Sequence, residues 1–313
     1  MSFLSQIIVA AFSMAGLADA NTPLANTAAT NSPETTQADP QLQSTTFVTD
    51  GTFHAEIEGP AVDAAGNLYA VNFIGKAEGT ADSHKGTIGK VTPEGETSLY
   101  LRLPAGSVGN GIRFDGQGRM YIADYMAHNI WRYDGKTLSL FTHEPRMHQP
   151  NDLAITHSGV LFASDPDWKN GSGQLWKILP DGSTILVESN MGTTNGVEVS
   201  QDQQFLYVNE SAQRRIWVYQ LDATAQPGQK KLLIEFPDFG LDGMRTDSQG
   251  NLYVARYGKG VIAKINPAGK VLAEIALQGK YPTNVSLDPT EQWLYVTMQQ
   301  RGAVERIQLK PQH

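Results

Sequence analysis

Six side chains that carry an oxygen atom recur at a nearly constant distance ahead of an aromatic residue. Five of them stand 11 residues before the aromatic residue, and one stands 12 before it because its turn is one residue longer. Two carboxylates and four amides that converge on one place suit a hard divalent cation, above all Ca²⁺, which takes about 6–8 oxygen ligands. The six residues are Glu58, Asn110, Asn151, Asn195, Asp242 and Asn284.

The types of these six residues restrict the chemistry further. The set contains no cysteine and no histidine, so it does not suit a soft metal. Asn and Asp also commonly begin strands, where their side chains bond to nearby backbone in local turns. Such a turn would explain one residue of this kind. Six at equivalent positions favour a shared site, and we therefore expect a metal centre.

A repeat of strands explains how these residues reach one place. Each of them begins a strand that is followed by a turn and by a second strand carrying the aromatic residue. The aromatic residues are 52, 41, 45, 46 and 42 positions apart, and a four-stranded propeller blade takes about 40–50 residues. Inner strands line the central channel of a propeller, so the oxygen-bearing residues should form a ring about its axis. The aromatic residues are Tyr69, Tyr121, Phe162, Tyr207, Tyr253 and Tyr295.

The two ends of the repeat predict how the ring of blades closes. Only one further strand, within "GAVERIQLK", follows Tyr295, so the last blade lacks its outer strand. The segment Ser44 to Asp50 resembles an outer strand and has no inner strands of its own. The fold class is therefore all-β: a six-bladed β-propeller of four-stranded antiparallel blades, closed by the N-terminal strand. An open β-sandwich, the alternative, would not need six matching units.

A second set of residues lies three positions after each aromatic residue. These positions are predicted near the far end of the second strands, where they are either exposed polar strand ends or functional residues. They are Asn72, Asp124, Asp165, Glu210, Arg256 and Met298.

Composition excludes several partners and cross-links. The 313-residue chain has a formal net charge of −8, whereas nucleic acids and anionic membranes require a basic face. It has no cysteine, which excludes disulfides and cysteine-based zinc sites. We expect no nucleic-acid partner, no membrane association of the mature form, and a monomer or weak oligomer.

The N-terminal segment differs from the rest of the chain. Residues 3–17 are mostly apolar but too few for a membrane span, and Ala18-Asp19-Ala20 fits the cleavage pattern of a secretory signal peptide. The segment lacks Lys and Arg ahead of its apolar part, and the alternative is a buried N-terminal helix. Residues 21–43 have the composition of a flexible linker. We expect a signal peptide over 1–20, a catalytic propeller over 44–313, and a periplasmic or secreted protein.

Four short motifs, one each in four of the blades, resemble those of a known family. They are Glu58-Gly59-Pro60, Pro150-Asn151-Asp152, Asn195-Gly196 and Asp242-Gly243-Met244. Together and in this order they resemble the gluconolactonase and senescence-marker-protein (regucalcin-like) family of six-bladed propeller hydrolases, to which diisopropylfluorophosphatase is related. The resemblance covers the chain from about Ser44 to its C-terminus.

The resemblance implies a reaction and a set of site residues. Glu58, Asn195 and Asp242 match the family's direct metal ligands, and Asn151 matches a fourth that is direct in some members and closer to substrate in others. The metal is usually Ca²⁺, sometimes Zn²⁺, Mg²⁺ or Mn²⁺, and the reaction is hydrolysis of a lactone, a small-molecule substrate. A carboxylate beside the metal can act as the base, so Asp242 is the predicted catalytic residue and Glu58 the second candidate. In phosphotriesterase relatives the equivalent Asp has been proposed as a nucleophile, which leaves both roles open.

Substrate contacts are predicted for residues around this centre. Family members that act on sugar lactones often carry an Arg just before the Pro-Asn-Asp motif, whereas this chain has His148-Gln149, with Arg146 a little earlier. Trp168 stacks on substrate or, alternatively, packs on the rim of a blade. The predicted substrate-binding residues are Asn110, Gln149, Asn151, Asp165, Trp168 and Asn284.

Two alternatives to lactone hydrolysis remain. Phosphotriester hydrolysis could use the same metal site. A non-catalytic binding propeller of the NHL type has similar repeats, but it has no need of axial Glu, Asn and Asp residues.

Overall fold

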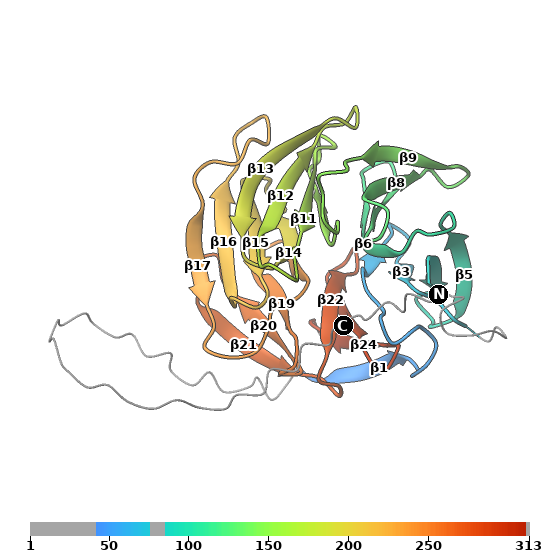
Figure 1. Ribbon diagram of the computed structural model, residues 1–313. Helices are drawn as coiled ribbons and strands as arrows, with labels where there is room; N and C mark the ends of the chain where they lie inside the picture. Colours follow the sequence, from blue (N-terminus) through green and yellow to red (C-terminus); the bar gives the residue numbers. More distant parts are fainter. Residues whose placement is uncertain (1–41, 76–84, 311–313) are drawn as a thin grey trace, which may run out of the picture. The chain divides into compact units, whose positions relative to one another are not determined.

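The computed structural model describes residues 42–75 and 85–310, and in these residues every regular element is a β-strand. The strands form six four-stranded antiparallel sheets in the order that the repeat predicts (Figure 1). The first sheet holds β2 (Ala61–Val62), β3 (Leu68–Val71), β4 (Thr87–Val91) and β5 (Thr97–Arg102). The second holds β6 (Gly109–Phe114), β7 (Met120–Asp124), β8 (Asn129–Tyr133) and β9 (Leu138–His143). The third holds β10 (Leu153–Ile155), β11 (Leu161–Asp165), β12 (Gly173–Ile178) and β13 (Thr184–Met191).

The remaining three sheets complete the six-bladed propeller. The fourth holds β14 (Thr194–Val199), β15 (Phe205–Glu210), β16 (Arg215–Gln220) and β17 (Lys231–Glu235). The fifth holds β18 (Met244–Thr246), β19 (Leu252–Arg256), β20 (Val261–Ile265) and β21 (Val271–Ala276). The sixth holds β22 (Pro282–Leu287), β23 (Trp293–Met298), β24 (Ala303–Gln308) and β1 (Ser44–Val48).

The ring closes as predicted, because β1 supplies the outer strand of the last blade. It pairs antiparallel with β24 from Ser44 opposite Ile307 to Val48 opposite Val304, and Figure 1 shows the blue strand beside the red one. The Ser44 hydroxyl also donates to Glu305 at 2.6 Å. A closed ring leaves no unpaired inner edge at the join between the two ends of the domain.

The aromatic residue of each repeat lies on the second strand of a blade and in three blades holds the preceding turn. The Asp63 carboxylate accepts the backbone N–H of Ala65 and Asn67 at 2.9 Å each, and the Tyr69 hydroxyl at 3.0 Å. Tyr121 with Asp115, and Tyr253 with Asp247, repeat this arrangement. The recurring Asp therefore orders the turn that connects the two inner strands.

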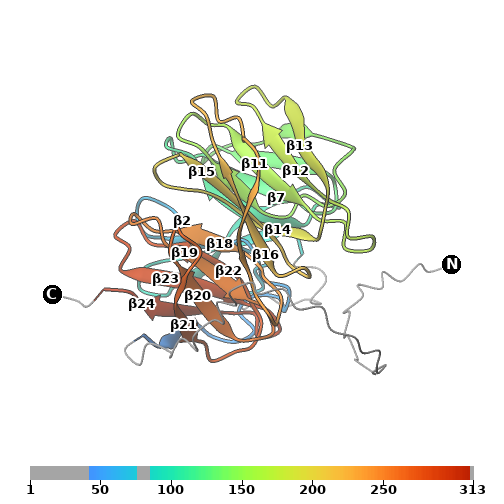
Figure 2. The ribbon, with the colours of Figure 1, turned by 90° about the vertical axis from the view of Figure 1, so that its left-hand side faces the viewer.

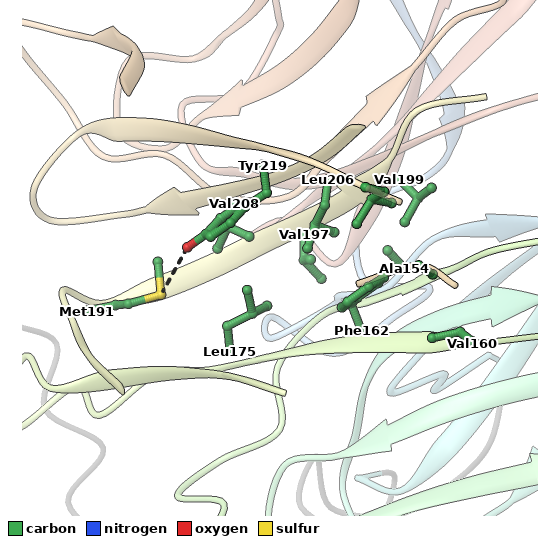
Figure 3. Close-up of a cluster of buried hydrophobic side chains, with 12 residues drawn as sticks. Ala154, Val160, Phe162, Leu175, Met191, Val197, Val199, Leu206, Val208 and Tyr219 are labelled. Atoms are coloured by element: carbon green, nitrogen blue, oxygen red, sulfur yellow. Dashed lines mark hydrogen bonds between the residues drawn. The ribbon is translucent and has the colours of Figure 1, made fainter. Parts of the chain in front are cut away.

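The core is divided into one apolar cluster for each interface between neighbouring blades. The cluster between the third and fourth blades contains Phe162 and Leu175 on one side and Val197, Leu206 and Tyr219 on the other (Figure 3). Five similar clusters fill the other interfaces. Figure 2 shows the inner strands β18, β19 and β22 of neighbouring blades side by side. Because both faces of every blade are covered, the second strands are buried along almost their whole length.

The predicted signal peptide, and all but the last two residues of the predicted linker, lie outside the described residues. Within residues 42–75 and 85–310, no helix has the length and hydropathy to cross a membrane.

The closure of the ring predicts the effect of trimming its last strand. Val48 is 3% exposed and packs with Phe53, Ile57 and Val304. We expect Val48→Ala to lower the free energy of unfolding by roughly 1–3 kcal/mol, measured by urea denaturation. The matched control is Leu99→Ala, on the outer strand β5 and 44% exposed, which should change stability by less than about 0.5 kcal/mol. Equal effects of the two variants would show that β1 does not stabilise the ring.

Candidate metal centre

The six oxygen-bearing residues lie at the same end of the six inner strands. Three of them are in or at the start of strands β6, β14 and β22, and the other three precede β2, β10 and β18 by two or three residues. Since the strands alternate in direction, the loops after the second strands and the segments that connect blades lie at this same end, which we call the loop face. Its described segments are 49–60, 72–75, 85–86, 103–108, 125–128, 144–152, 166–172, 192–193, 211–214, 236–243, 257–260, 277–281 and 299–302.

Glycines explain how the inner strands approach the axis so closely. A Cβ on Gly243 would lie 1.8 Å from Cγ of Asn284 in the next blade. One on Gly59, whose φ is +59°, would lie 1.7 Å from the backbone oxygen of Asn110. No side chain fits at such distances, so the glycine after the ring residue is a packing requirement. Gly111 and Gly196 occupy the same position in two further blades and are similarly confined.

Three of the predicted ligands present oxygen atoms that the protein leaves available. Oδ1 of Asn195 and Oδ1 of Asp242 are buried and have no hydrogen-bond partner. The Glu58 carboxylate accepts a hydrogen bond from the Gly59 N–H at 3.1 Å, and the Thr283 side chain lies close enough to lower its pKa. A buried oxygen atom without a hydrogen-bond partner costs free energy. We therefore expect a positively charged group to bind at this cluster and satisfy these oxygens.

The electrostatics of the two carboxylates lead to the same requirement. Burial raises the pKa of Glu58 to about 8, with Asp152 adding to the rise and the Gly59 N–H and Arg245 opposing it. Burial and the nearby charge of Glu58 raise the pKa of Asp242 well above its ordinary value, and the Asn195 amide opposes the rise. A divalent cation at this place would remove the repulsion and hold both groups ionised.

The donor set therefore fits a cation that prefers oxygen. In the part of the chain that the structure describes, no group of three or more His, Cys, Asp and Glu is arranged to hold a metal ion. The two carboxylates must accordingly be supplemented by amide oxygens, as Asn195 supplies here. Such a set suits Ca²⁺ rather than a soft metal.

The other three asparagines of the ring make different hydrogen bonds. Asn151 is 6% exposed, and its backbone oxygen accepts the Gly111 N–H at 2.8 Å and the Asn110 side-chain amide at 3.2 Å. The Asn284 oxygen accepts hydrogen bonds from the Val285 N–H at 2.9 Å and from Arg245 at 3.4 Å. Asn284 is 2% exposed, so its oxygen is committed to the protein and not to the ring.

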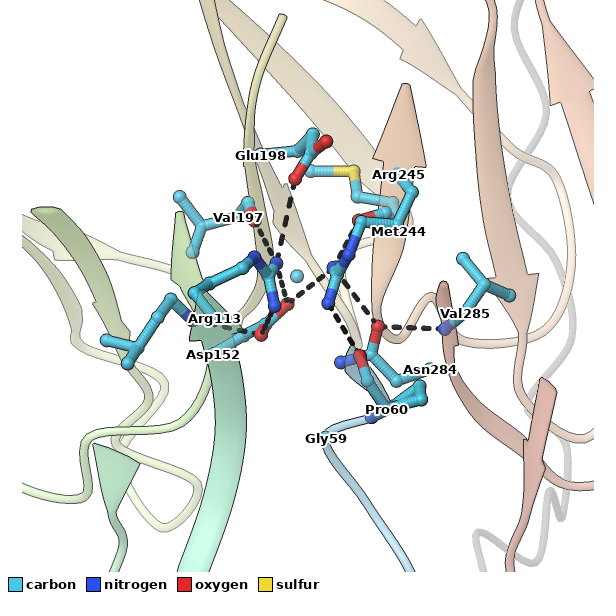
Figure 4. A network of polar contacts seen from close by, with 12 residues as sticks. Gly59, Pro60, Arg113, Asp152, Val197, Glu198, Met244, Arg245, Asn284 and Val285 are labelled. Atoms are coloured by element: carbon cyan, nitrogen blue, oxygen red, sulfur yellow. Dashed lines mark hydrogen bonds and ion pairs between the residues drawn. The ribbon is translucent and has the colours of Figure 1, made fainter. Parts of the chain in front are cut away.

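A second layer of charges lies deeper in the channel, beside the ring (Figure 4). Arg113 donates to the two carboxylate oxygens of Asp152 at 3.1 and 3.4 Å. Arg245 lies 3.6 Å from Asp152, and Glu198 lies 3.6 Å from Arg113. Burial and the neighbouring Arg113 lower the pKa of Arg245 to about 10. These two positive and two negative side chains balance one another, and sequence reasoning identified none of them except Asp152, as a local partner of Asn151.

The second set of residues supports the loop face instead of lining it. Asp165 is fully buried, and its carboxylate accepts the backbone N–H of His148 at 2.9 Å and of Gln149 at 2.5 Å. Asp124 and Glu210 likewise accept N–H groups of connecting segments. Of the two alternatives for the six positions, exposed polar strand ends are excluded, because all six side chains are buried. Asp165 thus positions the approach to Asn151 and makes no open surface for a substrate.

Two tyrosines that sequence reasoning missed border the ring at the loop face. Burial raises the pKa of Tyr125, while the side chains of Trp168 and Gln149 lie close to its hydroxyl and oppose the rise. Burial, Asp242, Tyr281 and Glu58 raise the pKa of Tyr257 to about 12. Each tyrosine follows the aromatic residue of its repeat by four positions, a pattern that could have identified both.

Comparisons with known proteins match most of the chain. A model of the SMP-30/gluconolactonase/LRE-like region matches residues 56–300. Gluconolactonase of Zymomonas mobilis is 30% identical over 207 residues, which are 54% of this chain and 58% of the relative. Diisopropyl-fluorophosphatase of Loligo vulgaris is 25% identical over 281 residues, covering 80% of this chain and 88% of the relative. The chain spans a little over half the length of the first curated relatives that it matches.

Solved structures share the fold. A gluconolactonase from Xanthomonas campestris superposes with a TM-score of 0.71 at 21% identity, over 87% of this chain and 91% of the other. A calcium-binding protein, regucalcin, from Agrobacterium tumefaciens superposes with a TM-score of 0.70 at 20% identity, over 83% and 92%. At these identities the likeness establishes the fold alone.

The confined glycines predict a local effect of adding one methyl group. Gly243→Ala would place Cβ inside the Asn284 side chain, and we expect it to lower the free energy of unfolding by about 2–3 kcal/mol or more. Gly116→Ala is the control, because a Cβ there meets nothing within 4 Å. Urea denaturation of both variants checks the expectation, and an unchanged Gly243→Ala protein would contradict it.

The raised pKa of Glu58 predicts how pH affects the metal-free protein. The folded chain holds this proton up to a pKa of about 8, whereas the ordinary glutamate pKa is 4.5. Unfolding therefore releases a proton between these values, and the free energy of unfolding falls as pH rises through this window. Asp242, whose pKa is also raised, contributes a fall of the same sign, so we expect Glu58→Gln to reduce the fall and saturating Ca²⁺ to reverse it, measured by urea denaturation with and without chelator.

A matched variant tests whether this pH dependence comes from the metal centre. Glu96→Gln changes an exposed residue between β4 and β5, and it should keep the wild-type pH dependence. A metal-free wild-type protein whose stability does not fall between these pH values would contradict the electrostatic account of the centre.

Proposed function

Because this chain belongs to the SMP-30/gluconolactonase/LRE-like family, we propose that it is a metal-dependent hydrolase of lactones. The observation that carries the proposal is the pair of buried, unpartnered oxygens on Asn195 and Asp242, beside the partly exposed Glu58. A propeller that only binds another protein has no use for this costly arrangement. Curated relatives that support lactone chemistry include a 6-deoxy-6-sulfogluconolactonase of Pseudomonas putida and a pentonolactonase of Haloferax volcanii.

The metal in this proposal is Ca²⁺, with Zn²⁺, Mg²⁺ or Mn²⁺ as substitutes. Glu58, Asn195 and Asp242 would hold it, with Asn151 as a fourth ligand or a substrate contact. A bound divalent cation supplies polarisation of the lactone carbonyl and a lower pKa for water. The regucalcin neighbour, which is described as calcium-binding, supports the choice of a hard cation.

In this proposal the side chains of the ring transfer the proton and orient the substrate. Asp242 accepts a proton from the attacking water on its carboxylate, and Glu58 is the alternative acceptor. The water oxygen adds to the carbonyl carbon, the ring C–O bond breaks, and the leaving oxygen takes the proton that the carboxylate accepted from water, which gives the hydroxy acid and restores the carboxylate. Asn110 lies beside this place and is half-buried, so its amide oxygen can orient the substrate. The charged layer around Asp152 closes the deep side of the site, which leaves the loop face as the approach for substrate.

Phosphotriester hydrolysis is the second candidate, and one observation favours it. The Loligo vulgaris diisopropyl-fluorophosphatase matches 80% of this chain and 88% of its own length, a larger shared extent than with the gluconolactonase. In that reaction Asp242 would act as a nucleophile or base on phosphorus.

The location of the protein is a separate part of the proposal. The apolar N-terminal segment and its Ala-x-Ala pattern favour export to the periplasm or the medium. The absence of cysteine from the chain is compatible with an oxidising compartment.

Removal of the metal should abolish activity. We expect one divalent cation per chain by mass spectrometry, and a loss of lactone hydrolysis in chelator that Ca²⁺ restores. Asp242→Asn should lower kcat at least about 100-fold, because it removes a proton acceptor. The rates would be followed by acid release in a pH-stat.

The control for this variant is Asp134→Asn. Asp134 is exposed on the turn between β8 and β9, and its Oδ1 accepts two backbone N–H groups that an asparagine oxygen can also accept. It should retain full activity. A well-folded protein that binds no metal would exclude the proposal, and an active, metal-loaded Asp242→Asn protein would exclude Asp242 as the base or nucleophile.

A further inference from the structure

Aromatic side chains stand on two sides of the ring at the loop face. On one side, Trp168 and Gln149 lie close to the Tyr125 hydroxyl, and the charge of Glu58 reaches the same group. On the other side, the rings of Tyr257 and Tyr281 are 5.2 Å apart, and Asp242 is among the charges that act on Tyr257. Aromatic rings therefore lie near both carboxylates at the described part of the loop face.

The loop face also exposes large apolar side chains that the fold does not require there. Met126, Trp168 and Phe239 are 57%, 42% and 49% exposed, and they come from three different loop-face segments. Phe239 covers Gly258, since a Cβ at that glycine would lie 3.3 Å from its ring. Exposed apolar side chains of this size near a polar site commonly mark a binding surface. All other exposed large apolar residues of the described chain lie on outermost strands: Leu99, Leu140, Ile185, Leu186, Leu232 and Leu272.

The arginines of the described loop-face segments are all engaged within the protein. Arg146 donates to both oxygens of Glu144 at 2.8 and 2.7 Å and stacks over the buried Trp176. Arg301 binds Asp50 at 2.7 Å. The third, Arg214, donates to the backbone oxygen of Phe236 at 3.3 Å. No described loop therefore offers a free guanidinium fork, the group best suited to paired substrate oxygens.

The lysines of the loop face do not replace a guanidinium fork for binding paired substrate oxygens. Lys259 binds Glu274 at 2.8 Å, and Lys85 binds Glu56 at 2.9 Å. Lys169 and Lys280 are exposed, but a lysine is a single charge on a flexible stem and lacks the fork geometry. The hydroxyl groups of a sugar lactone would lose their hydrogen bonds to water on binding here. No rigid set of charged donors replaces those bonds, so binding them costs free energy.

We propose that the preferred substrates are neutral lactones with an aromatic or apolar substituent, and that Trp168 and Tyr125 determine this specificity. This inference rests on the proposed lactone hydrolysis and names its substrate class. The substituent packs against the exposed face of the Trp168 ring, which Tyr125 supports from beside it, while the lactone carbonyl reaches the ring of oxygens. Aromatic and aliphatic groups gain most from such a contact because their burial removes apolar area from water.

The test compares three lactones of the same ring size on the Ca²⁺-loaded full chain. They are γ-phenyl-γ-butyrolactone, unsubstituted γ-butyrolactone and galactono-γ-lactone. We expect kcat/KM for the phenyl compound to exceed both others by at least about 10-fold, the range that an apolar contact provides. Trp168→Ala should reduce this preference about 10-fold through KM, and Trp168→Phe should retain most of it. Leu140→Ala, which removes an exposed apolar side chain of β9, should change none of the three values.

The outcomes distinguish a failure of the proposed substrate preference from a failure of the proposed lactone hydrolysis. If none of the three lactones is hydrolysed in a chelator-sensitive way, the proposed function fails. Chelator-sensitive hydrolysis with equal rates, or with a preference for galactono-γ-lactone, leaves the proposed function in place and overturns the inference. A phenyl preference that Trp168→Ala does not change overturns the role of Trp168.

Discussion

The meeting of six inner strands at one axis is the constraint on which the rest of the structure depends. Each blade is covered by a neighbour on both faces, so the apolar clusters lie between blades and the strands converge where the blades are narrowest. At four of the six positions that follow a ring residue, a neighbouring backbone or side chain leaves no room for a Cβ. Glycine stands at these positions, as at Gly59 and Gly243. The candidate metal centre is a product of this convergence, because the inner strands bring the ring residues of different repeats together there.

Convergence also concentrates charge. Glu58 and Asp242 are brought together from the first and fifth blades. Burial and the charge of Asp152 raise the pKa of Glu58, and burial and the charge of Glu58 raise the pKa of Asp242. In the deeper layer, protein side chains remove the repulsion between buried carboxylates, since Arg113 and Arg245 neutralise Asp152 and Glu198. The ring itself has no such internal cation. This difference between two adjacent layers leaves unpartnered oxygens in the upper one, where we propose that a metal binds, and balanced charges in the lower one.

The loop face carries the side chains from which we infer substrate selectivity. Its connecting segments are fixed by buried acids at the ends of second strands, of which Asp165 is the example nearest to Asn151. A segment that is held by hydrogen bonds to its backbone can present side chains without using them for its own stability. Gln149 is presented in this way near Tyr125 and Trp168, while the arginines are engaged by acids or backbone of the protein.

The sequence by itself determined the blade number, the closing strand and the positions of the ring, because these follow from the spacing of strands along one chain. It did not determine which ring oxygens are available. The Asn284 oxygen is taken by Arg245 from the neighbouring blade, and Asp165 is buried under a loop, although their spacing in the repeat equals that of their counterparts. Hydrogen-bond partners across blades depend on three-dimensional packing, so only the tertiary structure separated the free oxygens of Asn195 and Asp242 from those already satisfied.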